Sequence, residues 1–91
     1  MNMDKILDIA IEKDASDVHL ISGNKPMLRI SRELVPIEEM DVLTDDDMNE
    51  MYDYLVRGNI DKDEVFNTTR KLDTSYEYKD IRLRVNISLS N

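Results

Sequence analysis

The chain has 91 residues and so forms at most one domain, with 41% hydrophobic and 35% charged residues. This composition is ordinary for a soluble globular protein and argues against wholesale disorder. The formal net charge of −8, from 20 acidic and 12 basic residues, argues against a nucleic-acid or anionic-membrane partner for the whole surface, because binding to phosphates requires a basic field. A local basic face stays open.

The first part of the chain is predicted to form one helix followed by three strands. The i, i+3, i+4, i+7, i+8 spacing of an amphipathic helix is formed by Met3, Ile6, Leu7, Ala10 and Ile11. Strands are predicted at residues 17–22, 26–31 and 33–37, with a turn at 23–25 between the first two. Ser31 and Arg32 are predicted to join the last two as a hairpin, and Pro36 places the third strand at a sheet edge or at its own end.

The clearest helix signal begins at Thr44 and ends at Gly58, a good helix stop. Thr44 and Asp47 resemble a capping box, with aspartate where Glu or Gln is usual. The apolar face of this helix is formed by Met48, Met51, Tyr52 and Leu55.

A weaker helix is predicted at about residues 62–71, followed by strands at 73–78 and 81–89 with a tight turn at 79–80. This order predicts an α+β domain with an antiparallel sheet.

The last predicted strand alternates strictly between apolar and polar residues. Its odd positions are Ile81, Leu83, Val85, Ile87 and Leu89, and its even positions start with Arg82 and Arg84. A period of two places both arginines on the face opposite the core, pointing in the same direction. Two readings remain open: a solvated outer face, or a pair of guanidinium groups for a carboxylate or phosphate outside this domain.

Residues for catalysis, metal binding and nucleotide binding are scarce. One histidine, His19, and no cysteine leave no Cys-His pair, no multi-histidine site and no cysteine-based zinc site, so no catalytic or metal residue is predicted. The aspartates at 45–47 fit helix capping better than metal binding, because successive residues at a helix start face different ways. With only Gly23 and Gly58, the chain lacks a phosphate-binding glycine loop, so we expect no cofactor, no nucleotide binding and no ATP hydrolysis by this chain alone.

The chain is expected to be cytoplasmic. No apolar run approaches the ~18 residues of a membrane span. Met1 leads directly into an amphipathic, acidic segment, which is unlike the basic start and apolar centre of a signal peptide.

Four segments together resemble a known family. They are ASDVHL (15–20), GNKPMLRI (23–30), DTSYEY (73–78) and RLRVN (82–86), and they occur in the order and spacing of the N-terminal domain of the type IV pilus retraction ATPases, the PilT family. The resemblance spans nearly the whole chain. Three features depart from the family pattern: Lys25-Pro26 replaces two prolines, Ser31-Arg32-Glu33 replaces a glycine turn, and the catalytic RecA-like half is missing.

The resemblance implies a PAS-like fold, a small antiparallel sheet with helices packed on it. It also implies a role in oligomerisation and nucleotide sensing, in which the domain contacts its own and the neighbouring RecA-like domains of a homohexamer. The resemblance further implies a full-length motor with ATP and Mg²⁺ as cofactors, which would power pilus retraction, and so twitching motility, on the pilus platform of the inner membrane. Arg82 and Arg84 would then face the nucleotide phosphates or an interdomain partner, in a cleft that is empty here, so that they point at water. Asp17 and His19 match a family motif, with a structural role in local hydrogen bonding; the isolated domain is expected to be monomeric.

Other functions stay open. Related pilus-assembly and type II secretion ATPases share the Ser-Asp-x-His and Arg-x-Arg features, although their segments around these features differ. A stand-alone PAS-type small-molecule sensor would need a lined cavity, for which one Phe and no Trp offer little. An acidic adaptor that only bridges proteins would need no arginine pair. A phosphate-loop sequence beyond Asn91 would separate these readings.

Overall fold

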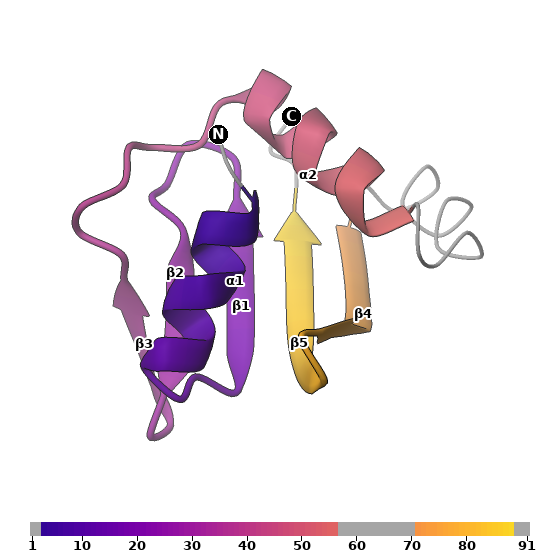
Figure 1. The fold of residues 1–91 in the computed structure, drawn as a ribbon. Coiled ribbons are helices and arrows are strands. Elements are labelled where there is room, and N and C mark those ends of the chain that lie inside the picture. Colours follow the sequence, from indigo (N-terminus) through magenta and orange to yellow (C-terminus); the bar gives the residue numbers. More distant parts are fainter. Residues whose placement is uncertain (1–2, 57–70, 89–91) are drawn as a thin grey trace.

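The computed structural model describes residues 3–56 and 71–88 (Figure 1). Its elements in chain order are α1 (Met3–Glu12), β1 (Asp17–Ile21), β2 (Met27–Ile30), β3 (Glu33–Pro36), α2 (Asp45–Val56), β4 (Lys71–Tyr78) and β5 (Ile81–Ser88). The α+β class is confirmed. The helix stop predicted at Gly58 lies outside the described residues, as does the predicted helix at 62–71 apart from Lys71, which opens β4. Within the described ranges, no helix is long and apolar enough to cross a membrane.

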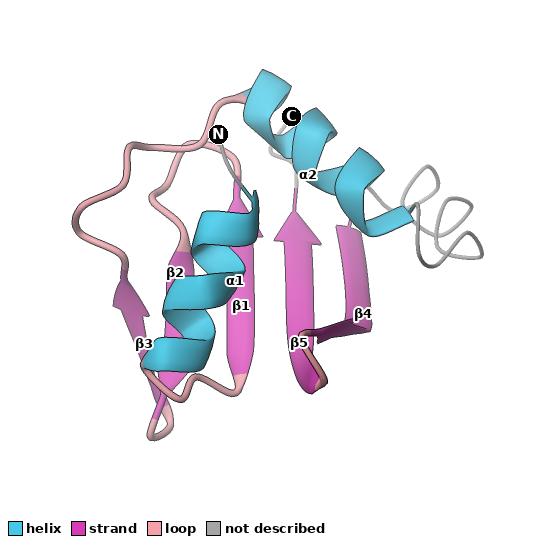
Figure 2. Cartoon of the chain, viewed as in Figure 1, coloured by secondary structure: helices cyan, strands magenta, loops and turns pink. Residues whose placement is uncertain are grey.

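The five strands form one mixed sheet in the order β3-β2-β1-β5-β4 (Figure 2). The prediction of an antiparallel sheet is wrong at one place, because the central strands β1 and β5 pair in parallel, with Val18 opposite Val85. The three other pairings are antiparallel. Turn residues fix only the pairing of strands that follow each other directly. Here β4 runs antiparallel to β1, and the turn at 79–80 then starts β5 at the same end of the sheet as β1, which makes β1 and β5 parallel.

Both predicted two-residue hairpins are confirmed. Ser31 and Arg32 connect β2 to β3 with φ angles of 51° and 73°, and Lys79 and Asp80 connect β4 to β5 with φ angles of 50° and 67°. Positive φ at both loop positions is the requirement of a type I′ turn, whose twist matches that of the flanking strands. These turns therefore set the register of the two outer hairpins.

One hydrophobic core joins the two helices to one face of the sheet. Figure 1 shows α1 lying over β1 and β2, roughly along the strands, while α2 crosses the end of the sheet beside β5. The predicted face of α2 is buried at Met48, Met51, Tyr52 and Leu55, and the sheet adds Val18, Leu20, Leu28, Leu83, Val85 and Ile87. On α1, Met3, Ile6, Leu7 and Ala10 are buried and Ile11 is half-buried. The sheet thus turns its apolar side chains toward the helices and its polar ones away.

Two aspartates of α1 accept hydrogen bonds from other elements, Asp4 from α2 and Asp8 from β4 and the turn that follows it. The Tyr54 hydroxyl of α2 donates a hydrogen bond to Asp4. Asp8 accepts hydrogen bonds from the Tyr78 hydroxyl at 3.1 Å and from Lys79 Nζ at 3.0 Å. Burial, together with these carboxylate acceptors, raises the pKa of both tyrosines, which therefore stay protonated as donors near neutral pH.

The predicted capping box at the start of α2 is confirmed, with aspartate in the acidic position. The Thr44 N–H donates to Asp47 Oδ2 at 2.9 Å, and the Asp47 N–H donates to Thr44 Oγ1 at 3.1 Å. The Thr44 N–H also holds the pKa of the Asp47 carboxyl below its usual value, because it stabilises the ionised form.

Replacing Thr44 by alanine should lower the free energy of unfolding by about 1 kcal/mol, because the Asp47 N–H loses its acceptor. Thr44→Ser keeps the hydroxyl and serves as the control, with little expected change. Urea unfolding followed by circular dichroism measures both. Equal stability of the alanine variant and the wild type would show that this contact does not hold the helix start.

Candidate functional site

Arg82 and Arg84 lie side by side on the face of β5 that turns away from the helices. The neighbouring residues Leu83 and Val85 are buried, as the period of two predicts. The arginine side chains are 65% and 63% exposed, respectively. Neither guanidinium group is therefore part of the hydrophobic core.

Both arginines are paired with side chains of β4. Arg84 makes a two-pronged contact with Asp73, in which Nε donates to Oδ1 at 3.1 Å and Nη2 donates to Oδ2 at 3.0 Å. Arg82 donates from Nη2 to Glu77 Oε1 at 3.1 Å and from Nη1 to Ser75 Oγ at 3.2 Å. The expectation that the arginines point only at water is wrong, because the β4–β5 register places Glu77 opposite Arg82 and Ser75 opposite Arg84.

Asp17 extends this charged surface to the centre of the sheet. It pairs in register with Arg29 of β2 on one side and with Arg84 of β5 on the other. Arg29 Nε lies 3.5 Å from Asp17 Oδ2. The hydrogen bonds and charge of Asp73 raise the pKa of Arg84, and the charge of Asp17 acts in the same direction. Arg29, Asp17, Arg84 and Asp73 thus alternate in sign across four strands.

His19 lies on the same face, one alternation further along β1, where it pairs in register with Met27 and Asn86. Its Nε2 atom is 3.8 Å from Asp17 Oδ2, too far for a hydrogen bond. This atom is shielded from solvent and has no hydrogen-bond partner among the described residues. The structure therefore places Asp17 and His19 on the same face of the sheet as Arg82 and Arg84. Asp17 forms an ion pair with Arg29 there.

We call this surface the open sheet face, defined by Asp17, His19, Arg29, Asp73, Ser75, Glu77, Arg82 and Arg84. Asp73, Thr74, Ser75 and Arg84 line an open hollow of about 400 Å³ on β4 and β5. Such an arrangement can bind an anion, because guanidinium groups present parallel N–H donors to a carboxylate or a phosphate. The opening allows a ligand to approach from solvent or from another domain.

Four residues of the open sheet face were missed from the sequence: Arg29, Asp73, Ser75 and Glu77. The last three could have been found, because the predicted two-residue turn at 79–80 already fixes which β4 residues lie opposite Arg82 and Arg84. No sequence pattern indicated that Asp17 and Arg84 lie close together, because this proximity depends on the parallel pairing of two strands far apart in the chain.

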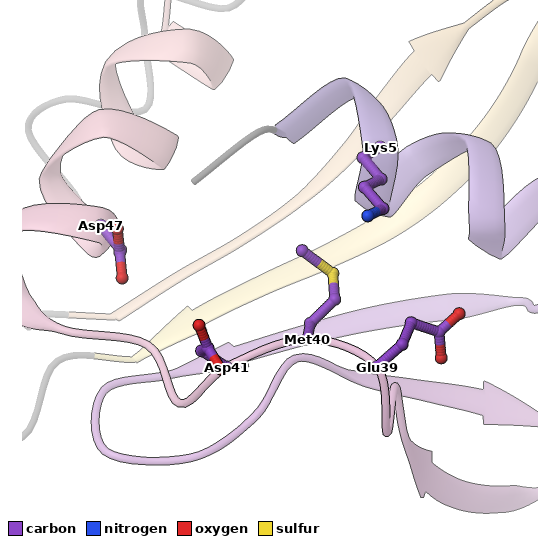
Figure 3. A pocket seen from close by; sticks show the side chains of 5 residues that line it. All are labelled: Lys5, Glu39, Met40, Asp41 and Asp47. Carbon is purple, nitrogen blue, oxygen red and sulfur yellow. The ribbon is translucent and has the colours of Figure 1, made fainter.

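A second hollow, of about 300 Å³, is lined by Lys5, Glu39, Met40, Asp41 and Asp47 (Figure 3). Asp47 is engaged in the capping box, and Lys5 contributes a positive charge from α1. Across residues 3–56 and 71–88, no three His, Cys, Asp or Glu side chains gather closely enough to hold a metal ion. We therefore take the open sheet face, and not this hollow, as the candidate site.

A scan against protein-family models finds no match to the chain, and a search of curated proteins finds none either. The likeness to pilus retraction ATPases therefore rests on the four sequence segments alone.

Proposed function

We propose that this chain is the N-terminal, PAS-like domain of a hexameric ATPase motor that powers type IV pilus retraction. In this role it serves ring assembly and nucleotide sensing. The observation that carries the proposal is the exposed pair Arg82 and Arg84, which belongs to neither the core nor a turn and is aimed away from the helices. The same pair lies in the segment that resembles the retraction ATPases.

The chemistry of the pair fits phosphate. A guanidinium group offers several N–H donors in a fixed plane and stays charged at all physiological pH values. In phosphoryl transfer, an arginine near the transferring group stabilises negative charge on the phosphate oxygens. Arg82 and Arg84 would provide this charge at the boundary between the domain and the nucleotide, while Asp17 supports Arg84 from β1.

The domain would supply only part of the nucleotide site. Its sequence has no phosphate-binding glycine loop, so ATP and Mg²⁺ would be held by a RecA-like domain in a longer chain. The domain's partners in this proposal are its own and the neighbouring catalytic domains, with the ring seated at the cytoplasmic side of the pilus platform. The overall acidity of the domain disfavours nucleic acid as a partner.

A small-molecule sensor has less support. Ligand sites of that class enclose most of the ligand surface in an apolar cavity. The two hollows described above are open, and charged side chains contribute to the lining of both. No contact on the open sheet face favours that alternative over an external phosphate.

The proposal is tested on the longer chain that contains this domain. We expect that chain to hydrolyse ATP and to form hexamers, and we expect the 91-residue chain to do neither, because it lacks the phosphate loop. Phosphate release and mass photometry measure the two properties on both chains. A longer chain without ATPase activity, or micromolar affinity of the 91-residue chain for MgATP, would rule the proposal out.

A further inference from the structure

The arginine pair of β5 is already occupied by carboxylates of the same chain. Asp73 meets Arg84 with both oxygens, and Glu77 meets Arg82 with one. A phosphate group meets an arginine with the same geometry, two oxygens against two N–H donors. The carboxylates of β4 therefore sit where a phosphate would make its contacts.

These ion pairs are suited to exchange. The side chains of Asp73 and Glu77 are 52% and 57% exposed, and those of their arginine partners are more so. Ion pairs this exposed are only weakly favourable, because water and salt screen the attraction and two long side chains must be ordered. Neither pair fills the core, so opening one leaves the fold in place.

An anion that enters beside Arg84 would also find space and a hydroxyl group to bind. The open hollow lined by Asp73, Ser75 and Arg84 adjoins the Arg84 contact. The Ser75 hydroxyl accepts a hydrogen bond from Arg82 and keeps its own proton for donation. A polyphosphate that replaced Asp73 and Glu77 would bring more negative charge to the two arginines than the carboxylates do.

We propose that Asp73 and Glu77 are internal counter-ligands: they occupy N–H donors of Arg82 and Arg84 until a polyphosphate anion displaces them. This inference rests on the proposed function, in which the arginines face phosphate. It assigns β4 a regulatory role: the strand keeps the pair neutral, so that the domain alone does not collect free phosphates. A phosphate presented at high local concentration by a catalytic domain then replaces the carboxylates.

The test measures the affinity of the 91-residue chain for pyrophosphate at low salt, by isothermal titration calorimetry. The variant Asp73→Asn/Glu77→Gln removes both counter-ligands with minimal change of shape. The control Asp53→Asn/Glu12→Gln removes the same two charges from exposed positions on α2 and α1. It therefore corrects for the general effect of making an acidic protein less acidic.

We expect the β4 variant to bind pyrophosphate at least about ten-fold more tightly than the control. Adding Arg82→Ala and Arg84→Ala to the β4 variant should remove this gain. If the β4 variant unfolds, Asp73→Asn is compared with Asp53→Asn, with an expected gain of at least about three-fold. Equal affinities of variant and control, or a gain that survives loss of both arginines, would overturn the proposal.

Failure of this inference can be told apart from failure of the proposed function. If only the counter-ligand role is wrong, the two variants bind pyrophosphate alike, while the longer chain still needs Arg82 or Arg84 for ATP turnover. If the proposed function is wrong, turnover does not depend on the arginines, whatever the pyrophosphate affinities are.

Discussion

Replacing Leu55 by alanine should lower the free energy of unfolding by roughly 2–5 kcal/mol. The side chain is 1% exposed and belongs to the buried face of α2, together with Met48, Met51 and Tyr52. Its removal loses apolar burial and leaves a cavity that the surrounding side chains fill only in part. Urea unfolding at constant pH measures the change.

The matched control is Asp53→Ala on the same helix, which is exposed and should change stability by less than about 0.5 kcal/mol. A loss below about 0.5 kcal/mol for Leu55→Ala would mean that this end of α2 does not pack on the sheet in solution.

The second large effect is expected at the arginine pair. In the longer ATPase chain that the proposed function requires, Arg82→Ala or Arg84→Ala should reduce ATP turnover about ten-fold or more, because a charge beside the phosphates acts mainly on the transition state. In the 91-residue chain, each substitution should change stability by no more than about 0.5 kcal/mol, since both side chains are largely exposed. Steady-state phosphate release and urea unfolding measure the two properties.

Arg32→Ala is the control for this experiment. Arg32 is also an exposed arginine, but it lies in the β2–β3 turn. Its backbone carbonyl accepts a hydrogen bond from Arg29 Nη1 at 3.3 Å, and alanine keeps that carbonyl. Its loss should leave turnover unchanged. Normal turnover in both the Arg82 and the Arg84 variant would refute the sensing role, and unfolding of either variant would make the arginine structural.

Local chemistry made most elements of this fold predictable. The helix faces follow from apolar spacing, and the start of α2 follows from the Thr44–Asp47 pair, which the structure shows as reciprocal hydrogen bonds. The hairpin turns at 31–32 and 79–80 were placed correctly although neither contains glycine. In each case the signal lies within a few residues of its effect.

The order of the strands could not be predicted in the same way. The pairing of β1 with β5 joins Val18 to Val85, and no turn residue records that contact. Both strands show the same alternation of apolar and polar residues, which is equally compatible with parallel and antiparallel neighbours. The charge alternation from Arg29 to Asp73 was hidden for the same reason, because it exists only once these strands lie side by side.

The parallel contact between β1 and β5 also affects how the chain folds during synthesis. β1 can pair with β2 soon after both have left the ribosome. Its other edge stays open until β5 has been made, and β5 ends 67 residues after β1 (88 − 21). At ~5–20 residues per second, that edge is exposed for several seconds. An unpaired strand edge is a template for intermolecular association. A newly made N-terminal half therefore has to be kept apart from its neighbours until the last strand of the domain arrives.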